Sequence, residues 1–157
     1  MKFGNWGKVA VVALGVAALS STVSAQDKET LVKNRVDFMK AAAADNKAIG
    51  DYAKGMATKE QATKAINDLV ERSTKIVALF PAGTSSADMP GKSNAKPDIW
   101  TDHAKFVGIA AALHDAAVKE AEVIKTGTPE EVGTAQAALG RTGCGGCHGP
   151  FREKLPG

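Results

Sequence analysis

Both cysteines of the chain lie in one short motif near its C-terminus, Cys144-Gly145-Gly146-Cys147-His148. This C-x-x-C-H spacing is typical of covalent haem c attachment. Residues three and four apart share one face of a helix, so both thiols and the imidazole can converge on one flat ligand. The thiols would add to the two haem vinyl groups as thioethers, and the imidazole of His148 would bind the iron.

Three other chemistries for the same five residues fit the chain less well. A thioredoxin-like dithiol requires a strand in a βαβ setting, and it gives His148 no task. A structural zinc site needs about four ligands, and only His103 and His114 remain to complete one. A disulfide between Cys144 and Cys147 would close a two-residue loop and constrain little of the unfolded chain. The motif therefore predicts one haem c, attached through Cys144 and Cys147.

The composition limits the kind of protein that would carry this motif. A length of 157 residues suits a single domain, and 44% of the residues are hydrophobic while only 5% are aromatic. The 20 basic and 17 acidic residues give a net charge of +3, which falls to +1 without the two lysines of the N-terminal leader. A charge so close to balance argues against a nucleic-acid binder. We identify no catalytic residues and expect a protein that is not an enzyme.

The first 25 residues have the pattern of a secretory signal peptide. Lys2 and Lys8 precede the apolar stretch Val9–Leu19, and small residues lead to Ala25. An eleven-residue helix would rise only about 16 Å, roughly half of a bilayer core, so an uncleaved membrane anchor is the weaker interpretation. We expect cleavage before Gln26, a periplasmic mature chain without membrane insertion, and one domain over residues 26–157.

The mature chain must position the motif with helices, because its apolar residues recur at helical spacing and no run alternates with period two. Capping boxes at Thr58 with Gln61 and at Thr128 with Glu131 mark two helix starts, and Pro81 marks an end. The one long connection, residues 81–97, contains three prolines. The predicted helices cover residues 27–54, 58–80, 97–125 and 128 toward 144.

Four helices of this length predict an all-α, antiparallel four-helix bundle. Their faces are rich in alanine and poor in aromatic residues, which would leave the centre under-filled at the usual packing density. Either a cofactor occupies part of the interior, or the alanines bring the helices closer together. Composition alone does not choose between these alternatives.

Residues 141–154, Arg-Thr-Gly-Cys-Gly-Gly-Cys-His-Gly-Pro-Phe-Arg-Glu-Lys, resemble the C-terminal haem helix of the class II c-type cytochromes, the cytochrome c prime family with its low-spin relatives. The resemblance extends to residues 33–39, 78–81 and 96–106, and so covers nearly the whole mature chain. It implies a left-handed bundle with haem near the C-terminus of the last helix, often paired into a homodimer. Pro150 departs from the family pattern, and we expect the helix to kink or stop near His148.

The resemblance places Met39 on the distal side of the iron, opposite His148. In low-spin relatives a methionine there binds the iron, whereas in cytochrome c prime an apolar side chain leaves it five-coordinate. Methionine on an inward helix face is also ordinary core filling. Arg35 lies one turn before Met39, where its guanidinium could reach a haem propionate or remain a solvated charge.

We expect Met39 to be the sixth ligand, so that the protein carries single electrons between Fe(II) and Fe(III) for redox partner proteins that the sequence does not identify. The alternative is a five-coordinate protein that binds nitric oxide or carbon monoxide. A third hypothesis is a helical module without haem that uses the cysteines for redox exchange. Tyr52, Trp100 and Phe106 are candidate pocket residues or plain core, and we interpret the two remaining histidines as surface residues.

Overall fold

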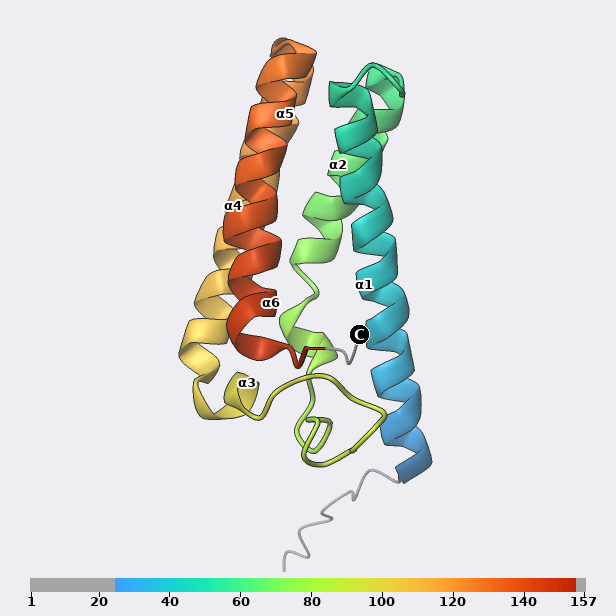
Figure 1. Ribbon diagram of the computed structural model, residues 1–157, viewed down its shortest axis with the longest axis vertical. Helices are drawn as coiled ribbons and strands as arrows, with labels where there is room; N and C mark the ends of the chain where they lie inside the picture. Colours follow the sequence, from blue (N-terminus) through green and yellow to red (C-terminus); the bar gives the residue numbers. More distant parts are fainter. Residues whose placement is uncertain (1–24, 155–157) are drawn as a thin grey trace, which may run out of the picture.

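The longest helix, α1, comprises Ala25–Ala53 and is the first element of the computed structural model, which describes residues 25–154 (Figure 1). The other long helices are α2 (Lys59–Ser73) and α4 (His103–Thr126). The last helix continues without interruption through α5 (Pro129–Ala138), the π-helix η2 (Leu139–Gly145) and α6 (Gly146–Phe151). Two short elements, η1 (Val77–Leu79) and α3 (Asp98–Thr101), lie between α2 and α4. Apart from Ala25, the predicted signal peptide lies outside the described residues.

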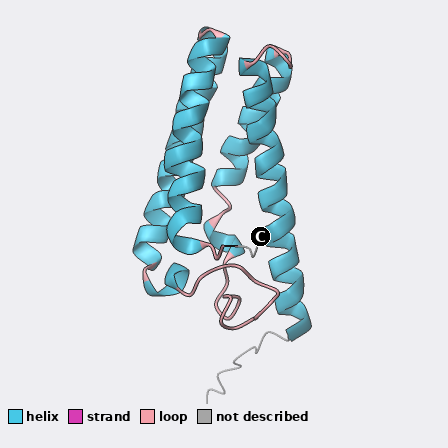
Figure 2. Cartoon of the chain, in the orientation of Figure 1, coloured by secondary structure: helices cyan, strands magenta, loops and turns pink. Residues whose placement is uncertain are grey.

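These helices form the predicted antiparallel bundle. Helix α1 packs against α2 and α5, and α4 packs against α2 and against all three parts of the last helix (Figure 1). Residues 25–154 contain helices and loops but no strand (Figure 2). No helix in this part of the chain is long and apolar enough to cross a membrane.

Both predicted capping boxes are confirmed, and they fix the short connections of the bundle. The Thr58 hydroxyl accepts from the Gln61 backbone N–H at 3.3 Å, and the Gln61 side chain accepts from the Thr58 N–H at 2.8 Å. Thr128 and Glu131 make the same exchange at 3.3 and 2.7 Å. Each box satisfies two N–H groups that a helix start leaves free, so these helices begin where local sequence dictates.

Helix α2 ends earlier than predicted, at Ser73 rather than near Phe80. The Ser73 hydroxyl donates to the Val70 carbonyl at 2.7 Å and also contacts His114 Nδ1 at 2.9 Å, while Thr74 donates to Glu71. Such local bonds compete with helix continuation, and the β-branched residues that follow continue it poorly. His114 is half-buried beside Ser73, so it is less exposed than the sequence interpretation as a surface residue suggested.

The long connection over residues 81–97 is an ordered clamp at the end of the bundle opposite the short connections. Its Lys96 N–H donates to the Phe151 carbonyl at 3.0 Å, and the Asn94 carbonyl accepts from the Glu153 N–H at 2.8 Å. Ala95 and Arg152 form an antiparallel bridge. The connection therefore holds residues 151–153, which follow the cysteine motif, in place.

The last helix differs from the expected kink or stop near His148, because it continues to Phe151. Pro150 removes one backbone donor, yet the helix accommodates it in its final turn. The irregularity lies earlier, in the π-helical residues 139–145, where the helix is locally wider. The motif is thus held on a continuous helical segment.

Candidate haem site

Cys144 lies in η2, whereas Cys147 and His148 lie in α6, so the motif spans the change from π- to α-helix. Both thiols are free and half-buried. Burial raises the pKa of Cys144 and raises that of Cys147 to about 11, so both are neutral thiols at pH 7. His148 is more exposed, and partial burial followed by the charge of Arg152 lowers its pKa. A neutral imidazole is the form that binds a metal ion.

Glycines let the motif segment approach α4 closely. A Cβ atom at Gly143 would lie 2.5 Å from Leu113 Cδ1, and one at Gly146 would lie 3.8 Å from Ile109 Cγ2. A side chain at 143 would thus require Leu113 or the helix to move. The close approach places the backbone of the motif against α4 and fixes the position from which the cysteines project.

Met39 and the two cysteines pack against the same hydrophobic core. All three are half-buried, and the core against which they pack includes Phe106, Leu113 and Leu139. The backbone of α1 nevertheless has no Cα within 8 Å of residues 139–151, although it packs against α5 just above them. Helices α1 and α6 accordingly stand apart in the lower half of Figure 1.

Arg35 is buried, with 5% of its surface exposed, so the alternative of a solvated charge is wrong. Its guanidinium donates to the Thr84 hydroxyl and carbonyl at 3.2 Å each and to the Ser93 hydroxyl at 2.9 Å. It also lies 4.6 Å from the centroid of the Phe80 ring, and burial lowers its pKa. Arg35 therefore ties the clamp to α1, one turn from Met39.

The aromatic candidates separate into two groups. Phe106 is fully buried and packs edge-on against Phe80 at 4.9 Å and Phe151 at 5.5 Å between ring centroids, and the Trp100 indole donates to the Phe80 carbonyl at 3.1 Å. This cluster adjoins the motif. Tyr52 lies thirteen residues beyond Met39, about 20 Å along α1, and belongs to the other half of the core.

One buried residue was missed by the sequence interpretation. Glu120 in α4 is 1% exposed, and neither carboxyl oxygen has a hydrogen-bond partner within the described part of the chain. Burial raises its pKa to about 7, and its charge contributes to raising the pKa of Cys144. The available signal was its spacing, since 113, 117, 120 and 124 form one inward stripe in which Glu120 is the only charged side chain.

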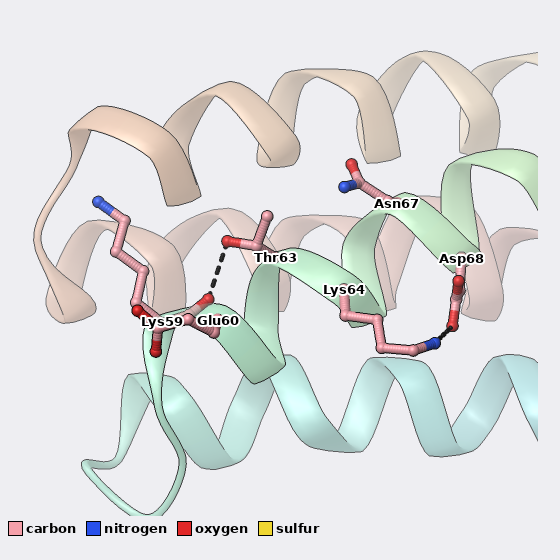
Figure 3. Close-up of a pocket in the computed structure, with 6 residues that line it drawn as sticks. All are labelled: Lys59, Glu60, Thr63, Lys64, Asn67 and Asp68. Carbon is pink, nitrogen blue, oxygen red and sulfur yellow. Dashed lines mark hydrogen bonds and ion pairs between the residues drawn. The ribbon is translucent and has the colours of Figure 1, made fainter.

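The competing interpretations of the motif lack support in the described residues. No group of three or more histidines, cysteines or carboxylates there is placed to hold a metal ion, which argues against a zinc site. His103 is exposed, as expected. The pocket along α2 in Figure 3 is lined by polar residues, including the Lys64–Asp68 ion pair at 2.6 Å, and contains neither cysteine.

The residues present fit a covalently bound haem. Two unpaired thiols and a metal-binding imidazole lie within one helical stretch, and they supply the full donor set of c-type attachment. The separation of α1 from residues 139–151, in a bundle otherwise closely packed, matches the presence of a large flat group between them.

The comparisons with known proteins agree with this fit. The family model described as Cytochrome C' matches residues 30–152. The chain belongs to the cytochrome c′ family. A cytochrome c′ of Pararhodospirillum photometricum is 32% identical over 126 residues, which are 80% of this chain and 98% of the relative. Haem c is therefore the cofactor, attached covalently through the cysteines of the motif.

Solved cytochromes c′ share the fold over nearly their whole length. The structure from Rhodobacter spheriodes has a TM-score of 0.74 and 28% identity, covering 82% of this chain and 99% of its own. The nitric oxide complex of a variant from Alcaligenes xylosoxidans has a TM-score of 0.70 and 26% identity, covering 82% and 97%. The predicted bundle and family resemblance are thus confirmed.

Proposed function

We propose that this cytochrome c′ binds a small diatomic gas, nitric oxide or carbon monoxide, at five-coordinate haem iron, with His148 as its protein ligand. This reverses the preference drawn from the sequence, which favoured Met39 as a sixth ligand and electron transfer. The observation that carries the proposal is membership of the cytochrome c′ family over residues 30–152. It is supported by the nitric oxide complex of the Alcaligenes xylosoxidans variant, a structure that this chain covers over 97% of its length.

Different residues of the chain attach the haem, bind its iron and limit access to it. Cys144 and Cys147 anchor the group, and the His148 imidazole, neutral at pH 7, supplies the proximal ligand. When bound, the haem supplies an iron atom with one coordination position open to a small ligand. Met39 is half-buried against the core and has three flexible side-chain torsions. Its side chain excludes large or polar ligands and can move aside for a diatomic one.

A second candidate function remains, because the residue at the distal position carries a thioether. A soft neutral sulfur is a good ligand for haem iron, and with His148 it would make a six-coordinate electron carrier. For either function we propose export to the periplasm with cleavage before Gln26. Homodimer formation and contacts with redox partners stay predictions.

The experiment that separates the two functions compares the native protein with Met39→Leu, which keeps the side-chain volume and removes the sulfur. We expect a high-spin optical spectrum in both proteins, and ferrous forms that both take up carbon monoxide readily. A low-spin native spectrum that becomes high-spin in Met39→Leu would instead show methionine ligation and favour electron transfer. Met56→Leu, at an exposed position between α1 and α2, is the control.

A further inference from the structure

Glu120 lies on the inward face of α4, among buried apolar side chains. It is one turn beyond Ala117 on a stripe that includes Leu113 and Ile124, all of them buried. Both carboxyl oxygens are buried without a hydrogen-bond partner among the described residues. An apolar side chain of similar volume would fill this position without the cost of removing a carboxyl group from water.

The burial makes this group change its charge near neutral pH. Burial in a medium of low polarity disfavours the ionised carboxylate and raises the pKa of Glu120 to about 7. Its protonated and ionised forms are thus close in free energy. A small change in the local electric potential is enough to shift the balance between them.

Glu120 also interacts with the group to which the haem is attached. Leu113, which meets Gly143 directly before Cys144, lies two turns from Glu120 on the same buried stripe of α4. Burial is the main cause of the raised pKa of the Cys144 thiol, and the negative charge of Glu120 adds to it. In the holoprotein the same sulfur is the thioether that carries the macrocycle. The charge of Glu120 and the charge on the haem therefore act on each other through a buried region, where water screens charges poorly.

No other charge offsets that of Glu120, since burial is the only cause of its raised pKa. The charged groups on the neighbouring elements are exposed, paired or part of the motif. These titratable groups are Lys59, Glu60, Lys64, Asp68, Glu71 and Arg72 on α2, Asp98 on α3, Glu130 and Glu131 on α5, Arg141 and Cys144 on η2, and Cys147 and His148 on α6. On α4 itself, His114 shares a hydrogen bond with Ser73.

We propose that Glu120 is a proton-binding site coupled to the oxidation state of the haem. One electron from a one-electron donor reduces Fe(III) to Fe(II), and one proton from solvent binds the Glu120 carboxylate to form its carboxylic acid. Oxidation releases both. No other bond forms or breaks, and the buried region keeps the same net charge in the two states.

The proposal fixes the direction in which the reduction potential of the haem changes with pH. Reduction adds a negative charge near Glu120, so the pKa of its carboxyl is higher in the ferrous protein than in the ferric one. Between these two pKa values reduction takes up a proton, and a higher pH makes that proton less available. The reduction potential therefore falls as pH rises through the neutral range. This dependence does not rest on the identity of the sixth ligand.

The test is a spectroelectrochemical titration of the holoprotein between about pH 5.5 and about pH 8.5. The equilibrium constant for reduction should fall by about threefold to tenfold across this range, a shift of up to about 59 mV for one electron. In Glu120→Gln, which keeps the shape and cannot ionise, the fall should disappear. Glu122→Gln, at an exposed position on the same helix, is the matched control and should behave as the native protein.

Infrared difference spectra provide a second measurement, and its decisive result comes from the native protein alone. The reduced-minus-oxidised spectrum of the native protein at pH 7 should contain a positive carboxylic-acid C=O band, which should be absent in Glu120→Gln. A potential that does not change with pH in the native protein, or one that changes equally in Glu120→Gln, would overturn the proposal. Native spectra without the carboxylic-acid band would also overturn it, even if Glu120→Gln failed to fold.

Discussion

At one end of the bundle, α1 joins α2 and α4 joins α5 through connections of a few residues, and both following helices begin with a capping box. We call residues 49–62 and 124–136 the short-turn end. At the opposite end, residues 81–97 and 139–153 combine an ordered clamp, a π-helix and the cysteine motif, and we call these the haem end. The helices of the short-turn end pack directly on one another, whereas α1 stands away from residues 139–151.

The difference shows that close helix packing and haem attachment are located at opposite ends of the bundle. Near the short-turn end, small side chains allow close contact, as where Gly50 meets the Gln136 side chain and Gln136 donates to the Asn46 carbonyl at 2.8 Å. At the haem end, polar groups are buried instead, and Arg35 makes its bonds to the clamp. Alanine and glycine therefore bring helices together at one end, while at the other end the haem attachment motif lies where α1 and the last helix are not in contact.

The largest loss of stability is expected from Arg35→Met, which removes the hydrogen bonds between α1 and the clamp. The change leaves the Thr84 carbonyl and the Ser93 hydroxyl without this charged donor inside the protein. Loss of hydrogen bonds to a buried charged group should lower the free energy of unfolding by about 2–4 kcal/mol. Urea unfolding of the holoprotein measures this value.

Lys33→Met is the control for that substitution, because Lys33 is exposed and makes only an ion pair with Asp37 at 2.6 Å. An exposed pair of this kind contributes little to the free energy of unfolding, because water and salt screen the two charges. Equal costs for the two substitutions would contradict the role assigned to Arg35 in holding the haem end together.

The sequence predicted the short-turn end well and the haem end only in part. Thr58, Gln61, Thr128 and Glu131 act through bonds to neighbours three residues away, so spacing alone reveals them. The early end of α2 at Ser73 involves side-chain bonds to the Val70 and Glu71 carbonyls, which the apolar spacing up to Phe80 did not reveal. The motif was identified from its own spacing, and the family from the longer resemblance.

Two buried residues outside both of these ends, Arg35 and Glu120, illustrate what sequence spacing does not reveal. Arg35 was recognised as a candidate, but its bonds to Thr84 and Ser93 form only when residues 81–97 fold against α1. Glu120 was overlooked because a glutamate among alanines suggests an exposed position. Only the packed bundle shows that it faces the interior.

The smallest loss of stability is expected from Thr128→Ala at the short-turn end. Losing the side-chain acceptor of the capping box should lower the free energy of unfolding by about 1 kcal/mol, and the optical spectrum of the haem should not change. Thr126→Ala is the control, since Thr126 is exposed and donates only to the Glu122 carbonyl within the same helix. A changed haem spectrum in Thr128→Ala would show that the two ends are not independent.

The central claim is that the haem completes the haem end, while the short-turn end folds by its own packing. Amide hydrogen exchange tests it most directly, by comparing the holoprotein with the double variant Cys144→Ala/Cys147→Ala. Protection of residues 81–97 and 139–153 should fall by about a hundredfold or more without the cofactor, whereas residues 49–62 and 124–136 should lose about tenfold or less. Equal loss at both ends, or unchanged protection at the haem end, would contradict the account.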